Sequence, residues 1–281
     1  MTSHSRRSFL ATAGASLFGV ACGPRLLGAL ATGRTLKKIG IQLYTVRSEM
    51  ARGVPATLAR LAHIGYGEVE FAGYYDYKPQ QIRDLLNSNG LTAPSTHVPI
   101  TAMEANPSQL FADAHTMGHE WLTVPMLMDR PTTVDGWKAV AERFNAVGRQ
   151  VRAAGLRFAY HNHNMEFRPL DDTLPYDILL QNTDPELVSY EMDLYWVTKA
   201  NQDPIAYLKK YPGRFKMFHV KDSSPAPERK MMDVGSGTID FPEIFAAASP
   251  NIEHYFVERD DTTNPFATAA ASFRYLHDLK F

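Results

Sequence analysis

The fold is decided by a stretch that reads Ile39-Gly40-Ile41-Gln42-Leu43-Tyr44. This short apolar run ends in polar side chains, and it lacks the glycine-rich turn that follows the first strand of a doubly wound nucleotide-binding sheet. Similar runs follow, separated by longer segments with helical periodicity. They cover residues 67 to 71, 91 to 97, 121 to 125, 156 to 161, 188 to 193, 215 to 220 and 254 to 258. Strands that alternate with helices in this way predict an α/β protein with a single (β/α)8 barrel.

Proline and glycine mark the ends of the segments between these runs. Proline fits the first turn of a helix, where its missing N–H costs nothing, and glycine fits the left-handed residue after the last turn. The pairs are Pro55 with Gly65, Pro79 with Gly90, Pro107 with Gly118 and Pro204 with Gly213. The most periodic segment spans residues 134 to 154, with an apolar face made by Trp137, Val140, Ala141, Phe144, Val147 and Val151. We expect this face to pack on the barrel.

The first 31 residues differ in composition from the rest of the chain. They contain no Asp or Glu, and their basic residues are Arg6, Arg7 and Arg25. Ser5-Arg6-Arg7-Ser8-Phe9-Leu10 leads into an apolar run, and Ala29-Leu30-Ala31 offers a cleavage site between small residues. The pattern predicts a twin-arginine export signal over residues 1–31, a barrel over residues 32–281 and a periplasmic or exported protein without a stable membrane span. The alternatives are an N-terminal membrane anchor and a lipoprotein attached through Cys22.

After cleavage the chain would be a mildly acidic protein. It would keep 26 basic and 30 acidic residues, a formal charge of about −4, and no cysteine. Disulfide bonds are then excluded, and no basic surface is left for nucleic acid or for an anionic membrane. The expected partner is a small molecule, and the oligomeric state is not predicted.

Polar side chains end nearly every predicted strand. Active sites of (β/α)8 barrels lie at this end of the strands, so the side chains are candidates for a functional site. In chain order they are Gln42, Tyr44, Glu70, His97, His161, His163, Asp193, His219, Lys221 and Glu258.

The last strands predict a metal site. A bare charge at the end of a buried strand is costly unless it is paired or bound to a cation. Asp193, His219 and Glu258 end three successive strands, and a fourth ligand is placed at His161. Imidazoles with carboxylates suit one divalent ion of Mn²⁺, Zn²⁺, Co²⁺ or Fe²⁺, with Mg²⁺ as a further option, better than Ca²⁺. The alternative for each residue alone is a salt bridge, a helix cap or a structural histidine.

Several motifs together resemble a known family. They are Ile39 to Tyr44, Tyr160-His161-Asn162-His163-Asn164, Met192-Asp193, Phe218-His219-Val220-Lys221-Asp222, Gly235-Ser236-Gly237-Thr238-Ile239-Asp240-Phe241 and Val257-Glu258. Over essentially the whole chain after the signal, they resemble the xylose-isomerase-like barrel superfamily of sugar isomerases, sugar-phosphate epimerases and inosose dehydratases. The resemblance implies one divalent ion held by a Glu, an Asp, a His and a Glu at the ends of strands five to eight. Asp193, His219 and Glu258 fall on the last three of these positions.

Strand five departs from the ketose epimerases of this family. Their metal-bound Glu opens a Glu-x-x-Asn motif and works with the strand-eight Glu as a proton-transfer pair. Here His161 stands where that Glu would be, which puts a mechanism with two carboxylates in doubt. Glu166 is the alternative as fourth ligand or as base. The histidine-rich motif is closer to the inosose dehydratase branch and to exported members.

The resemblance implies removal of a proton beside a carbonyl, with a metal-stabilised enediolate. Glu258 and either His163 or Glu166 would move protons. Lys221 would support the developing oxyanion, or it would form a salt bridge to Asp222 or Glu258. Substrate contacts are expected at Gln42, Tyr44, Glu70, His97 and Asn164.

The sequence is compatible with three functions. The first is an isomerase or epimerase of a sugar or keto-sugar. The second is a lyase or dehydratase that acts on a keto-sugar or 3-keto-glycoside by β-elimination, and the third is a non-catalytic sugar-binding barrel. Phosphorylated substrates are disfavoured because no arginine cluster ends the strands and Gly235-Ser236-Gly237 is the one candidate phosphate turn.

Overall fold

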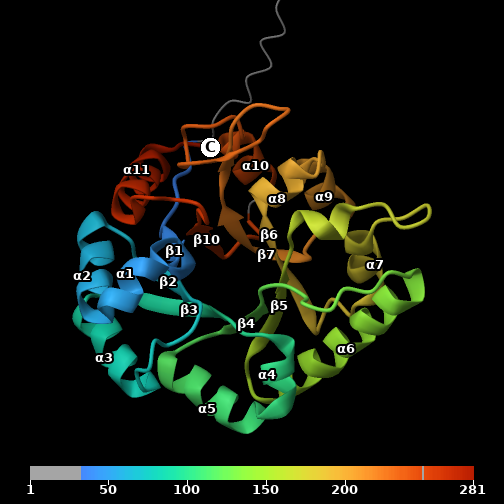
Figure 1. Ribbon diagram of the computed structural model, residues 1–281, viewed down its shortest axis with the longest axis horizontal. Coiled ribbons are helices and arrows are strands. Elements are labelled where there is room, and N and C mark those ends of the chain that lie inside the picture. Colours follow the sequence, from blue (N-terminus) through green and yellow to red (C-terminus); the bar gives the residue numbers. More distant parts are fainter. Residues whose placement is uncertain (1–32, 249) are drawn as a thin grey trace, which may run out of the picture.

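The predicted barrel is confirmed by a computed structural model, which describes residues 33–248 and 250–281. The predicted export signal and Cys22 lie outside the described residues. Parallel strands close the barrel in the order β1-β10-β7-β6-β5-β4-β3-β2 (Figure 1). They are β1 (Gly40–Gln42), β2 (Glu68–Phe71), β3 (Thr92–His97), β4 (Trp121–Val124), β5 (Arg157–His161), β6 (Val188–Asp193), β7 (Phe215–Val220) and β10 (His254–Val257).

Helices surround the strands on the outside (Figure 1). They are α1 (Arg47–Arg52), α2 (Val54–Ile64), α3 (Pro79–Ser88), α4 (Ile100–Ala105), α5 (Pro107–Met117), α6 (Val134–Ala153), α7 (Pro175–Asn182), α8 (Leu194–Lys199), α9 (Pro204–Lys210), α10 (Phe241–Ala248) and α11 (Pro265–Asp278). Short 3-10 turns, η1 (Leu43–Val46) and η2 (Asn164–Phe167), follow β1 and β5. A small antiparallel pair, β8 (Asp222–Ser223) with β9 (Met231–Met232), follows β7. Within the described ranges, no helix has the length and apolar character needed to cross a bilayer.

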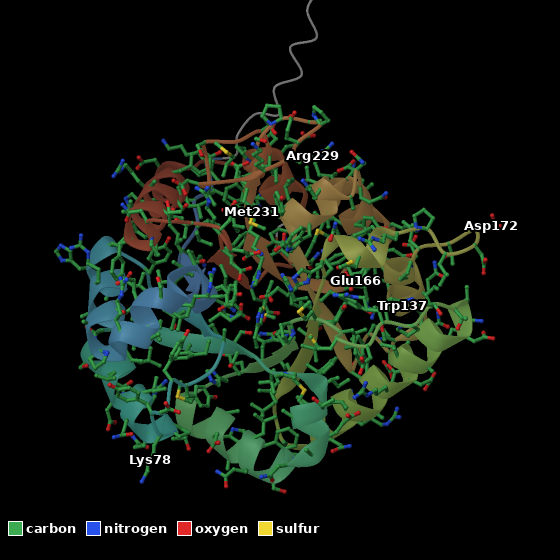
Figure 2. All side chains as sticks on the ribbon, in the orientation of Figure 1. Lys78, Trp137, Glu166, Asp172, Arg229 and Met231 are labelled. Carbon is green, nitrogen blue, oxygen red and sulfur yellow. The ribbon has the colours of Figure 1, made fainter. Side chains whose placement is uncertain are left out.

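The predicted helix signals agree with the structure. Proline occupies the first positions of α3, α5 and α9. The apolar face of α6 is buried as expected, including Trp137, which is labelled in Figure 2. One boundary is wrong: Leu43 and Tyr44 belong to η1 and not to the first strand, because the side chain of Gln42 accepts a hydrogen bond from the Tyr44 N–H and turns the chain.

The interior of the barrel is divided into an apolar floor and a polar upper part. Trp121, Ala159, Met217 and Phe256 form the floor as one buried cluster. Residues two further along a strand point to the same side, so the next inward positions lie directly above them. These positions include Thr123, His161 and His219. The polar groups of the site therefore lie directly above a buried apolar layer.

Gly40 allows β1 to pass the ring of Phe256 in this floor. A Cβ atom on Gly40 would lie 2.4 Å from Cδ1 of Phe256 and 3.2 Å from the carbonyl oxygen of Tyr255. We expect Gly40→Ala to lower the free energy of unfolding by about 1–3 kcal/mol, because the added methyl overpacks the floor. Urea denaturation measures this, with Gly67→Ala as control, where the nearest atom to an added Cβ is 3.8 Å away. Equal stability of the two variants would contradict the expectation.

Candidate metal centre

Four of the predicted residues meet at the C-terminal end of the barrel. His161 ends β5, Asp193 ends β6, His219 lies near the end of β7 and Glu258 directly follows β10. One ligand atom from each lies within 4.8 Å of all the others, and all four residues are buried. The parallel strands bring these positions together, as the sequence predicted. We call this set the upper group.

The upper group has the spacing of a metal site. Nε2 of His161 lies 3.2 Å from Oδ2 of Asp193, and Nδ1 of His219 lies 2.7 Å from Oε2 of Glu258. Neither Nδ1 of His219 nor Oε2 of Glu258 has a hydrogen-bond partner among the described residues. Buried polar atoms are rarely left in this state without a missing water or ion. A divalent ion bound about 2.0–2.2 Å from each ligand atom fits this donor set of two imidazoles and two carboxylates.

Lys221 supplies the positive charge beside the upper group. Its Nζ lies 2.6 Å from Oε2 of Glu258 and 3.1 Å from both Oδ2 of Asp193 and Oδ1 of Asp260. Burial alone would lower the pKa of Lys221, but the carboxylates of Asp193 and Glu258 raise it well above its ordinary value. Burial opposes ionisation of Glu258, yet Lys221 and His219 hold the pKa of this carboxyl well below its usual range. The carboxylates are therefore charged and available as ligands.

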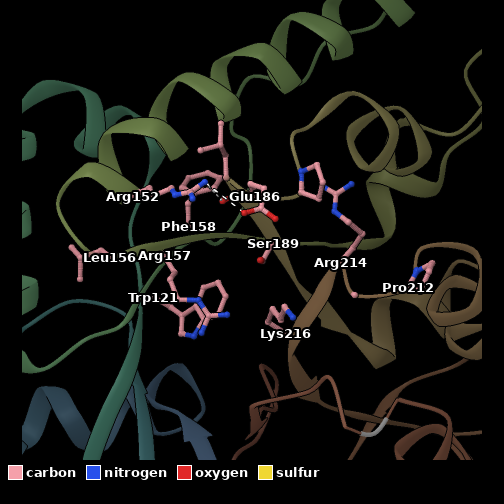
Figure 3. Close-up of a pocket in the computed structure, with 13 residues that line it drawn as sticks. Trp121, Arg152, Leu156, Arg157, Phe158, Glu186, Ser189, Pro212, Arg214 and Lys216 are labelled. Carbon is pink, nitrogen blue, oxygen red and sulfur yellow. Dashed lines mark hydrogen bonds and ion pairs between the residues drawn. The ribbon is translucent and has the colours of Figure 1, made fainter.

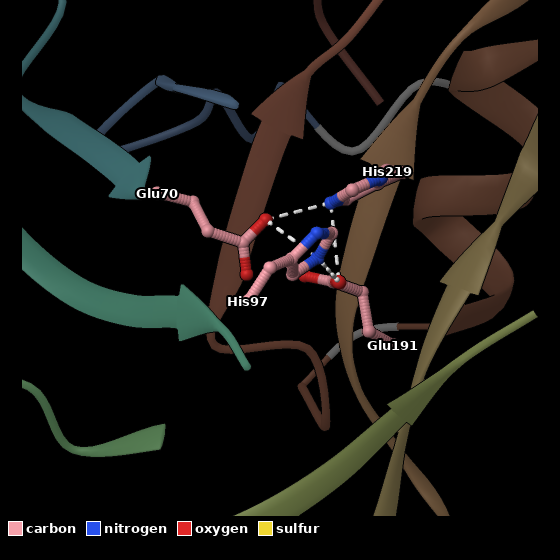
Figure 4. A group of neighbouring side chains, drawn as sticks. All are labelled: Glu70, His97, Glu191 and His219. Carbon is pink, nitrogen blue, oxygen red and sulfur yellow. Dashed lines mark hydrogen bonds and ion pairs between the residues drawn. The ribbon is translucent and has the colours of Figure 1, made fainter. Parts of the chain in front are cut away.

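A second buried group lies deeper in the barrel, and we call it the lower group. It consists of Glu70, His97, Glu191 and His219 (Figure 4). Nε2 of His219 lies 2.7 Å from Oε2 of Glu70 and 3.1 Å from Oε2 of Glu191. Nε2 of His97 lies 3.3 Å and 3.1 Å from the same two oxygens. Burial lowers the pKa of His97, but Glu70 and Glu191 outweigh it and raise this pKa.

His219 belongs to both groups through its two ring nitrogens. When Nε2 donates its hydrogen to Glu70, Nδ1 carries the lone pair that faces Asp193 and Glu258. A carboxylate behind a metal-ligating histidine fixes its tautomer and raises its basicity. Gln42 extends this support, because its Nε2 donates to Oε2 of Glu70 at 2.7 Å. The predicted substrate contacts at Gln42 and Glu70 are thus placed beneath the upper group.

Glu191 was missed by the sequence interpretation. It lies two residues before Asp193 on β6 and therefore points to the same side of the strand. This spacing could have identified Glu191 from the sequence. We expect Glu191→Gln to weaken metal binding about 10–100-fold, because an amide holds the His219 tautomer less strongly than a carboxylate. Competition with a chelator measures this affinity. Glu142→Gln, on the exposed side of α6, is the control, and equal affinities would rule out the supporting role.

His161 and Glu166 occupy different environments. His161 lies in the upper group, and its Nδ1 lies 2.9 Å from the carbonyl oxygen of Pro125, so that Nε2 faces Asp193. The carboxylate of Glu166 accepts hydrogen bonds from the Tyr160 hydroxyl at 2.9 Å and the His163 N–H at 2.8 Å. Glu166 thereby caps η2 and is not part of the upper group. Burial raises its pKa.

This difference predicts which residue is the fourth ligand. We expect His161→Gln to lower metal affinity more than about 100-fold, because loss of a direct ligand should exceed the effect of a supporting residue. Glu166→Gln should keep about one ion per chain at the same metal concentration. Inductively coupled plasma mass spectrometry of both dialysed variants measures the ion content. The reverse outcome would make Glu166 the ligand.

A cavity of about 430 Å³ opens above the upper group. Its polar wall contains His97, His161, His163, Lys221, Glu258 and Asp260, and its other wall contains Tyr44, Ala72, Pro99, Pro125 and Met126. The predicted Tyr44, His97 and His163 are therefore at the cavity, whereas Asn164 lies in η2 and is not among its lining residues. The other lining residues that come from loops beyond the strands were not predicted, and they are Ala72, Pro99, Pro125, Met126 and Asp260. A cavity of this size and mixed character is typical of a small-molecule site.

The candidate phosphate turn is filled by the protein itself. Oδ2 of Asp222 accepts hydrogen bonds from the N–H groups of Gly235 at 2.9 Å and Gly237 at 2.8 Å. Oδ1 of Asp222 accepts from the Ile239 N–H at 3.2 Å. The turn therefore anchors the chain after β7 and has no donors left for a substrate phosphate. Lys221 correspondingly pairs with Glu258, not with its neighbour Asp222.

Comparison with known proteins gives consistent relatives. A sequence profile of the xylose isomerase-like TIM barrel family matches residues 58–276. An inosose dehydratase from Bacillus anthracis (strain CDC 684 / NRRL 3495) is 27% identical over 183 residues, which cover 56% of this chain and 59% of that protein. The chain thus spans about three fifths of the length of the curated relatives it matches.

Solved structures resemble the whole barrel. A crystal structure of a sugar phosphate isomerase/epimerase from Parabacteroides distasonis ATCC 8503 superposes with a TM-score of 0.76 at 28% identity, covering 88% of this chain and 97% of that one. The IOLI protein, whose crystal structure has a bound zinc atom, superposes with a TM-score of 0.67 at 12% identity, covering 84% and 95%. The latter likeness concerns the fold alone.

Proposed function

Because the chain belongs to the xylose isomerase-like TIM barrel family, we propose that it is a divalent-metal-dependent isomerase or epimerase of a sugar or keto-sugar. The observation that carries this proposal is the convergence of four buried ligand atoms in the upper group, where Nδ1 of His219 and Oε2 of Glu258 lie 2.7 Å apart without hydrogen-bond geometry, beneath a cavity of about 430 Å³. The relatives that are named as sugar phosphate isomerase/epimerase and inosose dehydratase support a sugar-like substrate.

His161, Asp193, His219 and Glu258 would hold the ion. Bound there, a divalent cation supplies a Lewis acid that polarises a substrate carbonyl and stabilises the negative charge on its oxygen. Glu258 lines the cavity, so its carboxylate is placed to take the proton from the carbon beside that carbonyl. Lys221 lies 2.6 Å from Glu258 and is placed to donate a hydrogen bond to the same oxygen or to a neighbouring hydroxyl.

His163 is the second group for proton movement. It lines the cavity, and its Nδ1 has no hydrogen-bond partner among the described residues. Glu166, the other candidate, holds His163 by accepting its backbone N–H. We therefore assign proton transfer to Glu258 and His163, and a positioning role to Glu166. Tyr44 and the apolar residues that line the cavity would pack against the C–H groups of the sugar.

A lyase is the second candidate, because one observation weighs against epimerisation and not against elimination. The second carboxylate of the epimerase pair is absent, since His161 stands at its position and the Glu166 carboxylate is bound to Tyr160 and to backbone. Isomerisation and β-elimination need one base on the face where the proton leaves, whereas epimerisation needs a second group on the opposite face. The inosose dehydratase relatives agree with elimination.

Incubation with free sugars, keto-sugars and 3-keto-glycosides in D₂O tests the proposal. An isomerase or epimerase would give a deuterated isomer or epimer, detected by NMR and mass spectrometry. An unsaturated product would establish the lyase in its place. Saturable sugar binding with neither deuterium uptake nor turnover, in protein loaded with Mn²⁺, Zn²⁺, Co²⁺, Fe²⁺ or Mg²⁺, would overturn both and leave a binding protein.

A further inference from the structure

A second cavity lies at the opposite end of the barrel from the upper group. It has a volume of about 510 Å³. Figure 3 shows the side chains that line it. Trp121 and Arg157 are the first residues of β4 and β5, and Ser189 and Lys216 are the second residues of β6 and β7. The cavity therefore opens at the N-terminal ends of four neighbouring strands, about a strand length from the metal centre. We call it the basal cavity.

The basal cavity is strongly basic. Its lining contains one carboxylate, Glu186, and four basic side chains, which are Arg152, Arg157, Arg214 and Lys216. Arg157 is neutralised by Glu253 through contacts of 2.5 Å and 2.8 Å, and Arg152 lies 3.7 Å from Glu186. Arg214 and Lys216 have no carboxylate partner among the residues the structure describes. The charge of Arg214 is met only by neutral acceptors, the Leu180 and Val188 carbonyls and the Thr183 hydroxyl, and Lys216 lines the cavity with no side-chain partner among the described residues.

Several nitrogen donors around the cavity lack an acceptor. Arg214 donates from its terminal nitrogens to the Leu180 carbonyl and, at 2.7 Å, to the Thr183 hydroxyl, but its Nε is buried without a partner. The indole N–H of Trp121, a residue only 1% exposed, also has no partner. The Lys216 ammonium makes no side-chain hydrogen bond within the described ranges. Unsatisfied donors in a buried wall favour a ligand made of acceptors.

We propose that the basal cavity binds a tetrahedral oxyanion of the phosphate or sulfate class. Such an anion has four acceptor oxygens and a charge that matches Arg214 and Lys216. Guanidinium and ammonium groups are the usual ligands of these oxyanions in proteins. The Ser189 hydroxyl is a further donor in the lining of the cavity.

A bound oxyanion would contact both β6 and β7, the strands that contain the proposed metal ligands Asp193 and His219. Arg214 and Lys216 lie at the start of β7, which carries His219, and Ser189 lies on β6, which carries Asp193. Because a ligand that binds the folded state alone stabilises it, phosphate should raise the melting temperature. The basal cavity is thus a site for stabilisation or regulation, separate from the substrate cavity.

Isothermal titration calorimetry with inorganic phosphate, on the metal-loaded protein at constant ionic strength, tests the proposal. We expect saturable binding of one phosphate per chain and a higher melting temperature in phosphate or sulfate than in chloride. Lys216→Met and Lys216→Glu should each weaken this binding at least about tenfold, since either removes the cation that has no other partner. Lys209→Met, on the exposed side of α9, should bind as the wild type does.

The Asp193→Asn variant separates the two cavities. Phosphate binding that persists in Asp193→Asn and is lost in both Lys216 variants places the anion in the basal cavity. Binding lost in Asp193→Asn and retained in the Lys216 variants would place the anion at the metal centre and overturn the proposal. Equal effects of phosphate and chloride on the melting temperature would also overturn it.

Discussion

Asp193→Asn should empty the metal centre while leaving the barrel folded. Asp193 has two tasks, because Oδ2 faces His161 in the upper group and Oδ1 accepts the Trp196 N–H at 2.8 Å, which caps α8. Asparagine keeps an oxygen for the cap but loses the charge that a divalent cation requires. We expect the ion content to fall from about one to below about 0.1 per chain. The value of kcat/KM should fall by about three orders of magnitude or more, roughly 4 kcal/mol of transition-state stabilisation.

Metal analysis together with circular dichroism measures this effect. Asp135→Asn, in the exposed first turn of α6, is the matched control and should keep both ion and activity. An Asp193→Asn protein that carries a full complement of the ion at wild-type activity would show that the upper group is not the site. Loss of helical signal would instead mean that the cap had failed, and Asp193→Ser, which retains a capping oxygen, would then replace it.

Glu258→Gln should stop proton transfer more completely than it removes the ion. The variant keeps an amide oxygen near His219, so a raised metal concentration should restore occupancy through the three remaining ligands. The amide cannot accept a proton at neutral pH, so kcat should stay reduced about 10²–10⁴-fold under that condition. Deuterium uptake from D₂O into the substrate, measured at saturating metal, reports this step.

Two control variants are needed to interpret the Glu258→Gln result. Glu142→Gln should exchange deuterium as the wild type does, and Glu258→Asp should retain part of the activity because it preserves the base at a longer reach. Wild-type deuterium uptake by a fully loaded Glu258→Gln protein would assign the base elsewhere, with His163 as the next candidate among the residues that line the cavity.

The fold and the site residues at the C-terminal ends of the strands could be predicted because both follow from short sequence patterns. Runs with polar ends predict parallel strands, and the C-terminal ends of parallel strands in a barrel converge. Asp193, His219 and Glu258 could be placed in the upper group by this pattern alone. Glu191 was overlooked because it lies inside its strand and not at the end, where the site residues were sought, and its partners His97 and His219 come from other strands.

Loop residues were harder to place, for a physical reason. The Glu166 carboxylate is positioned by η2, whose conformation depends on a hydrogen bond from Tyr160 and not on the local sequence pattern. Asp260 lines the cavity, and its Oδ2 accepts a hydrogen bond from Lys221. No pattern in the sequence indicates this contact. The resemblance to a family suggested a ligand at strand five, but only the packed structure distinguishes His161 from Glu166 as a member of the upper group.

The depth of the ligands has a kinetic consequence. His161, Asp193, His219 and Glu258 are each less than 5% exposed, and their support by Glu70 and Glu191 lies deeper still. Because all four proposed ligands are buried, several of them would have to move before a bound ion could leave, and we expect its exchange to be slow. Affinities of such donors for first-row metals rise toward Cu²⁺ regardless of biological need. The identity of an ion bound at the proposed site would then depend on which metals are available when the chain folds, more than on those that surround the protein afterwards.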